Sequence, residues 1–151
     1  MRRSRCCRDL RGDEGSASIE FLTVGLLLLV PLSYLVLALA SIQSASFAVE
    51  GAARHAARVF VQASSVGAAQ AAAARAVEVT LADYGLDASS ARVSIVCRPD
   101  PADCLARRGF VTVSISTVAP LPLFPAVLGT DVPPGVTLDS VATEQVSRFA
   151  P

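Results

Sequence analysis

The chain has 151 residues, a formal net charge of zero at pH 7 and a mean hydropathy of +0.52. Its thirteen basic residues are all Arg and are balanced by thirteen acidic residues, so the chain lacks the positive excess typical of nucleic-acid-binding surfaces. Only residues 22–42 are free of charge for long enough to cross a membrane, which excludes a multi-pass protein. About a hundred residues remain beyond this segment, enough for one small domain.

Residues 1–14 are rich in basic side chains. An excess of Arg beside an apolar segment keeps that end of the chain in the cytoplasm, so we expect the residues after 42 to lie outside the membrane. The adjacent Cys6 and Cys7 lack the spacing of a metal site, and we assign them no role. The charged residues of this leader are Arg2, Arg3, Arg5, Arg8, Arg11, Asp9, Asp13 and Glu14.

An apolar segment, residues 19–42, follows the leader. A helix of about 20 residues spans a hydrocarbon core of roughly 30 Å, so this segment is long enough to cross a membrane once. Glu20 lies inside the segment, and a carboxylate there is costly enough to indicate a functional role. Pro31 removes one backbone hydrogen bond and is expected to bend or loosen the helix.

The start of the apolar segment resembles the class III signal of type IV pilins and pseudopilins. Residues 15–21 read Gly-Ser-Ala-Ser-Ile-Glu-Phe. The resemblance implies that a prepilin peptidase cleaves after Gly15 and that Ser16 becomes the new N-terminus. It also implies that Glu20, as the fifth residue of the processed chain, and the neighbouring Phe21 take part in assembly with adjacent subunits.

An ordinary signal peptide is the alternative interpretation of the same segment. Ala38-Leu39-Ala40 before Ser41 fits its small-x-small cleavage pattern. Its apolar region would then extend from residue 19 to residue 37, whereas about 7–15 residues are usual, and it would contain Glu20. The pilin-like signal is therefore favoured.

The helix is expected to leave the membrane and continue to residue 62, because residues 43–62 lack Pro and consist mostly of helix formers. Small residues recur along it every four positions. Such a stripe suits close packing against helices of related subunits, although an alanine-rich composition also produces it, and both interpretations stay open. The residues of the stripe are Ala40, Ser44, Ala48, Ala52 and Ala56, with Ala45, Ala53 and Ala57 beside them.

Residues 52–58, Ala-Ala-Arg-His-Ala-Ala-Arg, resemble a stretch that follows the span in the TadE-like branch of the pilin superfamily. The resemblance covers residues 15–62, and it departs at Ser16, where many type IV pilins have Phe. It implies a minor pseudopilin of a tight-adherence (type IVc) pilus system. The implied partners are a prepilin peptidase, other pilins or pseudopilins and the pilus assembly platform.

The remaining residues, 63–151, are expected to form an extracytoplasmic α+β domain. Ser64-Ser65 can cap a second helix that ends at Gly85 and lies against a sheet. Residues 92–97 and 110–118 alternate apolar and polar side chains, as an antiparallel strand pair does. The apolar face of the helix consists of Val66, Ala69, Ala73, Val77, Leu81 and Tyr84.

The end of the domain is less regular. Five prolines between residues 118 and 134 predict a surface loop that either makes contacts or folds back over the sheet. Residues 136–149 suit a strand or a helix, and the family resemblance favours a third strand over at least 136–143.

Cys97 and Cys104 enclose six residues in the part of the chain expected outside the cytoplasm, where disulfides persist. We predict that they form a disulfide, which chain entropy makes worth roughly 2.5 kcal/mol. A zinc site would need two further ligands, and a redox site would prefer Cys-x-x-Cys.

The sequence contains no motif for catalysis, and we expect neither enzymatic activity nor a cofactor. His55 is interpreted as a solvated helix residue. We therefore expect a minor pilin or pseudopilin in the bacterial cytoplasmic membrane, with its N-terminus inside and its domain outside. The alternative is a secreted or single-pass membrane-anchored binding domain.

Overall fold

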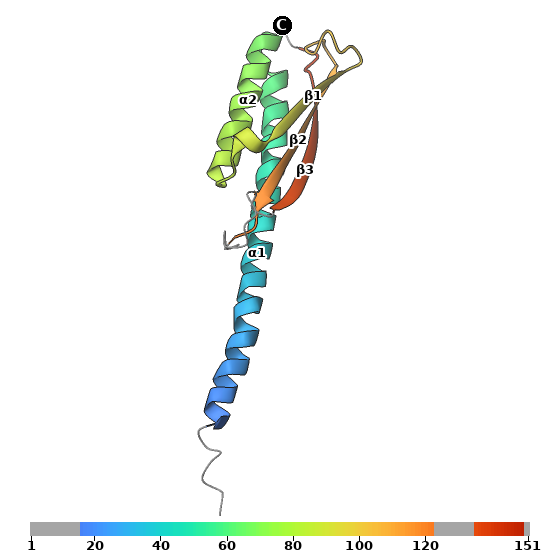
Figure 1. Cartoon of the computed structure of the whole chain (residues 1–151). Coiled ribbons are helices and arrows are strands. Elements are labelled where there is room, and N and C mark those ends of the chain that lie inside the picture. Colours follow the sequence, from blue (N-terminus) through green and yellow to red (C-terminus); the bar gives the residue numbers. More distant parts are fainter. Residues whose placement is uncertain (1–15, 123–134, 150–151) are drawn as a thin grey trace, which may run out of the picture. The chain divides into compact units, whose positions relative to one another are not determined.

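The structure is a computed structural model that describes residues 16–122 and 135–149. The fold is α+β, as predicted, and its strands form one antiparallel sheet in the order β1-β2-β3 (Figure 1). The elements are helix α1 (Ser16–Val61), helix α2 (Val66–Asp83), the 3-10 turn η1 (Ala88–Ser90), and strands β1 (Arg92–Arg98), β2 (Phe110–Pro120) and β3 (Gly135–Gln145).

Contacts divide the chain into two compact units, Met1–Leu37 and Ala38–Pro151. The boundary lies within α1, so the second unit begins well before residue 63, where we expected the domain to start. The reason is that the C-terminal half of α1 supplies part of the core of that unit.

The alanine stripe of α1 is buried within the second unit. Ala48, Ala52 and Ala56 pack into the same apolar core as α2 and the sheet, whereas Ala40 and Ser44 are exposed. Small side chains let neighbouring backbones approach closely, and a Cβ on Gly51 would lie 3.8 Å from Thr80 Cγ2 of α2. Most of the stripe therefore packs against the chain's own elements, which corrects the lateral-packing interpretation for these positions. The other buried alanines of the stripe are Ala45, Ala53 and Ala57.

Helix α2 begins and ends close to the predicted positions. The Ser65 hydroxyl oxygen accepts a hydrogen bond from the Ala68 N–H at 3.3 Å and caps the N-terminus. Four of the six residues predicted for its apolar face are buried, but Val66 and Tyr84 at its two ends are exposed. The buried four are Ala69, Ala73, Val77 and Leu81.

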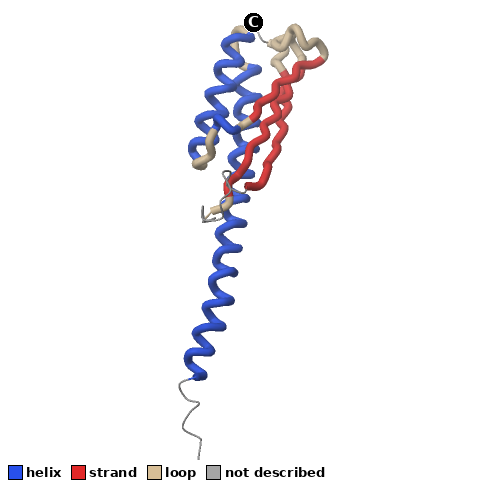
Figure 2. Tube along the Cα trace, in the orientation of Figure 1, coloured by secondary structure: helices blue, strands red, loops and turns tan. Residues whose placement is uncertain are grey.

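Strand β2 lies between the other two strands, and both helices cover one face of the sheet (Figure 2). Alternate residues of β2, from Val111 to Ala119, are buried on that face. The intervening residues lie on the opposite, outer face. The pairing Arg98–Phe110 sets the register with β1, and Phe110–Gln145 sets it with β3. The third strand favoured over residues 136–143 is confirmed.

The predicted loop over residues 118–134 starts later than expected. Strand β2 continues through Val118 and ends at Pro120, which lies opposite Gly135 of β3. The missing proline N–H is tolerated at the end of a strand, so the predicted loop was wrong for residues 119 and 120, and the predicted strand over 110–118 is two residues longer than expected. The rest of that loop, 123–134, lies outside the described residues.

Candidate processing and assembly segment

The predicted cleavage position lies at the first residue that the structure describes. Ser16 is the first residue of the helix, and Gly15 lies outside the described residues, as does the basic leader. Cleavage between Gly15 and Ser16 would therefore leave the new α-amino group at the N-terminal end of α1.

Glu20 lies one turn into α1 and is exposed. Within the described part of the chain, no hydrogen bond or ion pair involves its carboxylate. Phe21 beside it is 79% exposed, and Thr23 donates its hydroxyl hydrogen bond to the Ile19 carbonyl at 2.7 Å. The segment thus presents a carboxylate and an aromatic ring that the chain's described residues do not engage.

The helix around these residues is apolar on all sides. Each of the five consecutive residues from Leu26 to Val30 is more than half exposed, and five residues cover more than one full turn. Only 6% of the most apolar 18-residue window of α1 is buried, unlike the core helix of a soluble protein. By length and composition, α1 is able to cross a membrane once.

Pro31 lies inside α1, and the helix continues on both sides of it. A bend is expected there because proline lacks the N–H that would bond to the Leu27 carbonyl. This bend stays a prediction.

The alternative cleavage site, Ala38-Leu39-Ala40, also lies within α1. Its backbone is therefore held in helical hydrogen bonds rather than in an extended or loose segment.

The stretch that resembles the TadE-like branch divides into two faces. Its four alanines are buried in the core, whereas Arg54, His55 and Arg58 are exposed. Arg54 forms an ion pair with Glu50 one turn earlier. The repeat of two alanines and one arginine is thus a pattern of inward and outward residues, and it serves packing within this chain.

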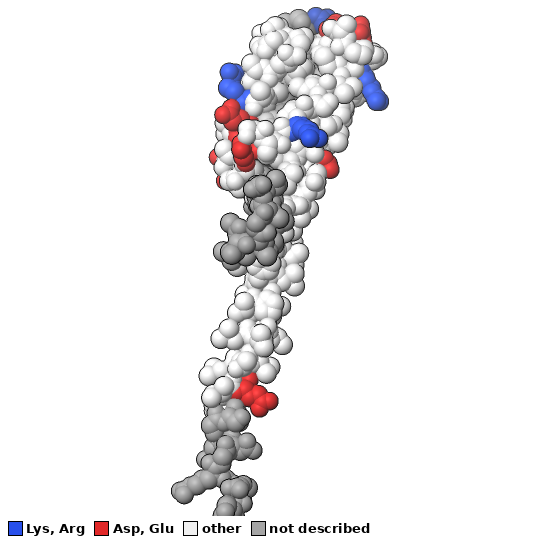
Figure 3. Space-filling model, viewed as in Figure 1, with Lys and Arg blue, Asp and Glu red and all other residues white. Residues whose placement is uncertain are grey.

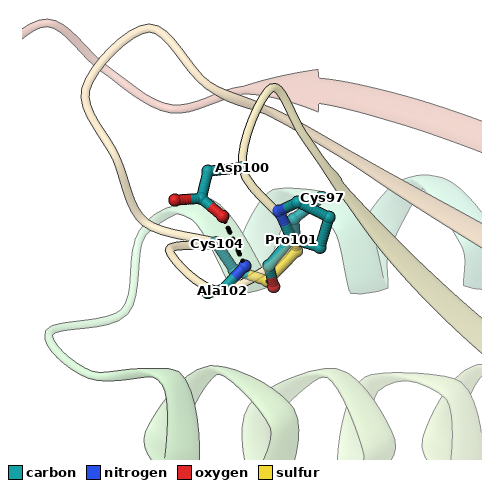
Figure 4. Close-up of a disulfide and its surroundings, with 5 residues drawn as sticks. All are labelled: Cys97, Asp100, Pro101, Ala102 and Cys104. Carbon is teal, nitrogen blue, oxygen red and sulfur yellow. Dashed lines mark hydrogen bonds between the residues drawn. A yellow bond between two sulfur atoms is a disulfide. The ribbon is translucent and has the colours of Figure 1, made fainter.

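A disulfide joins Cys97, at the end of β1, to Cys104 in the connection between β1 and β2, with their Cα atoms 5.1 Å apart (Figure 4). Between them the Asp100 carboxylate accepts a hydrogen bond from the Ala102 N–H at 2.9 Å. Asp100 and Asp103 are exposed turn residues. Among the residues that the structure describes, no group of three His, Cys, Asp or Glu is placed to hold a metal ion.

A groove of about 920 Å³ lies between α2 and β1. Its lining includes apolar residues of α2 and β1 together with the acidic Glu78 and Asp87. Asp87 accepts hydrogen bonds from the Ser89 hydroxyl and the Ser89 N–H, at 2.7 and 2.8 Å, and these hold the pKa of Asp87 below its ordinary value. Sequence reasoning missed this groove, because its residues come from separate elements. Only the Asp-x-Ser pattern at residues 87–89 gave a local signal, and it indicates a turn.

No protein-family model, curated protein or solved structure matches this chain.

Proposed function

We propose that the chain is a minor pilin or pseudopilin of a Tad-type (type IVc) pilus assembly or secretion system. In this proposal it crosses the bacterial cytoplasmic membrane once, with the leader inside and the domain outside. It acts as a structural subunit, without catalysis or a cofactor. A prepilin peptidase cleaves it after Gly15, and its partners are other pilins or pseudopilins and the assembly platform.

The observation that supports this proposal best is the environment of Glu20. An apolar residue at this position would insert into a membrane more readily, so membrane insertion does not explain the carboxylate. A charge in a low-dielectric setting needs a partner of opposite sign with good geometry, because desolvation costs several kcal/mol. The α-amino group that cleavage creates on Ser16 of a neighbouring subunit would be such a partner.

The position of the alternative cleavage site is further support. Proteases cut exposed, loose backbone most readily, whereas residues 38–40 are helical and Ala38 is buried. Cleavage before Ser41 would also remove Glu20 and leave its presence unexplained. The segment 16–40 is better accounted for as part of the mature chain.

The proposal is tested with Glu20→Leu expressed beside its partner pilins. We expect normal insertion and cleavage but at least about tenfold lower recovery in sheared filaments or crosslinked complexes, the equivalent of about 1.4 kcal/mol. Thr23→Leu is the matched control, because it also makes this part of α1 more apolar and leaves the carboxylate in place. Incorporation of Glu20→Leu at the wild-type level would show that Glu20 only anchors the helix near the lipid headgroups.

The mature N-terminus provides the second arm of the test. Mass spectrometry should find Ser16 first in the processed chain, and Gly15→Leu should accumulate as full-length precursor in the membrane. A mature chain that begins at Ser41 or keeps Met1, or unchanged processing of Gly15→Leu, would refute the pilin assignment. The first of these results would favour a secreted binding domain.

A further inference from the structure

The groove between α2 and β1 is lined by apolar residues and by two acidic residues. We define this acidic groove by Ala73, Val77, Glu78, Asp87, Val93 and Ile95. Val93 is 43% exposed, although it lies on the face of the sheet that the helices cover. Among the described residues that line the groove, none is basic. Ala73 and Val77 are buried, so the accessible apolar surface comes mainly from Val93. An exposed apolar side chain beside two carboxylates is suited to a partner that carries both apolar and positive side chains.

The turn at the end of α2 keeps the acidic groove in shape. The Ser90 hydroxyl lies 3.3 Å from the hydroxyl of Thr117, a buried residue of β2. Asp87 is held by its hydrogen bonds from Ser89, which also keep the pKa of Asp87 below its ordinary value. The carboxylate of Asp87 therefore has a defined position at the groove.

A second surface of the same domain has the opposite character. It is a hollow of about 720 Å³ on the outer face of the sheet, beside the disulfide-linked connection. Phe110 is 47% exposed there, and the described residues that line it include no acid. We define this arginine patch by Arg98, Pro99, Pro101, Arg108 and Phe110.

The charges around the two surfaces are complementary. Residues 66–95, which include all the residues that line the acidic groove, carry two Arg against three acids, a net charge of −1. Residues 97–110 and 145–149 carry four Arg against two Asp, a net charge of +2. In Figure 3 the largest acidic cluster on the visible face of the domain lies beside α2. The charged residues counted are Arg75, Glu78, Asp83, Asp87 and Arg92 for the first set and Arg98, Arg107, Arg108, Arg148, Asp100 and Asp103 for the second.

Strand β1 contributes to both surfaces from its opposite faces. Val93 and Ile95 lie on the face toward the helices and line the acidic groove, whereas Val96 and Arg98 lie on the outer face and line the hollow of the arginine patch. One copy can therefore offer its groove and its patch at the same time. A contact between two different surfaces of identical chains is heterologous, and it leaves a free groove at one end and a free patch at the other.

From this arrangement we propose that the acidic groove of one copy binds the arginine patch of a second copy of this chain. Arg98 and Arg108 face Glu78 and Asp87 across the contact, and Phe110 and the two prolines cover the exposed Val93. The contact repeats head to tail. It lies within residues 73–110 and does not depend on Glu20 or on cleavage after Gly15.

The test uses the purified full-length chain in detergent, in two differently tagged forms. A photo-crosslinking residue in place of Val93 should link the two forms, and mass spectrometry should place the link between residues 98 and 110 of the second copy. Increasing ionic strength should lower the yield, because the contact depends on charge. A link to another part of the second copy, or no link between copies, would overturn the proposal.

Charge-reversal variants test whether the crosslink depends on pairing between the acidic groove and the arginine patch. Glu78→Arg in the groove copy, or Arg98→Glu in the patch copy, should each lower the yield about tenfold, and combining the two should restore it. Asp139→Arg and Arg58→Glu, both at exposed positions outside the two surfaces, are the matched controls and should leave the yield unchanged. Failure of the combined reversal to restore crosslinking would contradict the contact. A Glu20→Leu chain should still crosslink, which separates this result from the test of the proposed function.

Discussion

A single glycine determines how α2 ends. Gly85 has a φ of +70°, in the left-handed region that side chains disfavour. Its N–H donates to the Ala82 carbonyl at 2.9 Å, and the Leu86 N–H donates to the Leu81 carbonyl at 3.0 Å. These two bonds form a Schellman motif, and the buried Leu81 and Leu86 supply its apolar contact. The motif directs the chain from α2 toward η1 and β1.

The same substitution at two glycines should have opposite effects on stability. Gly85→Ala should lower the free energy of unfolding by about 1 kcal/mol, because a Cβ disfavours the left-handed backbone. Gly67→Ala, inside α2 with open space around its Cα, should raise it by up to about 1 kcal/mol, because alanine favours the helix. Denaturant unfolding of the full chain, followed by circular dichroism, measures both. If both substitutions changed the free energy of unfolding in the same direction and by the same amount, the left-handed backbone would not be the reason for glycine at position 85.

At the scale of the element, α1 changes its role along its length. Residues 19–37 expose apolar side chains on every side. Between Ala45 and Phe60 most apolar residues are buried and Arg54 and Arg58 are exposed, although Phe47 is also exposed. A helix with one small-residue face packs closely against a neighbouring helix and a sheet. One continuous helix can thus serve an apolar environment in its first part and a folded domain in its second.

The buried alanines of α1 should not tolerate larger side chains. Ala53→Leu should lower the free energy of unfolding by about 1–3 kcal/mol, because three added carbons have no space in a packed core. His55→Leu, two residues along the same helix but exposed, is the control and should change it by less than about 0.5 kcal/mol. Equal tolerance at both positions, measured by denaturant unfolding, would show that this face of α1 is not packed as described.

The connection between β1 and β2 depends on the disulfide between Cys97 and Cys104. The chain-entropy relation gives roughly 2.5 kcal/mol for a loop of this length, so replacing both cysteines with alanine should lower the free energy of unfolding by about that amount. Non-reducing peptide mapping of exported protein should find the two residues linked. Free thiols at both positions, or unchanged stability of the double variant, would contradict a stabilising disulfide.

At the scale of the whole molecule, charge is distributed unevenly along the chain. Residues 1–14 hold five of the thirteen Arg, residues 21–49 hold no charged side chain, and the remaining charges lie mainly in the domain. Removal of the leader after Gly15 would leave eight Arg and ten acidic residues, a net charge of −2. In the mature chain proposed here, attraction between copies would come from the local acidic groove and arginine patch, since a net negative charge alone makes copies repel.

Local sequence signals determined the elements of this protein. The apolar segment, the Ser65 cap, the Gly85 stop and the alternation at residues 92–97 and 110–118 predicted two helices and a strand pair, because capping and periodicity act within one element. The end of β2 was predicted too early. Proline lacks the backbone N–H that a strand interior needs, but the end of a strand tolerates it, as at Pro120. The processing and assembly role proposed for Gly15 and Glu20 rests on sequence alone, since its signal is one of order and spacing.

Only the tertiary structure decided what each surface faces. The alanine stripe alone was compatible with packing inside the domain or against other subunits, and the fold buries it from Ala45 to Ala57. Glu78, Asp87 and Val93 come together only because α2, the turn after it and β1 fold against one another, and no spacing along the chain encodes that proximity. The same holds for Arg98 and Arg108, which the antiparallel register of β1 and β2 brings to one hollow.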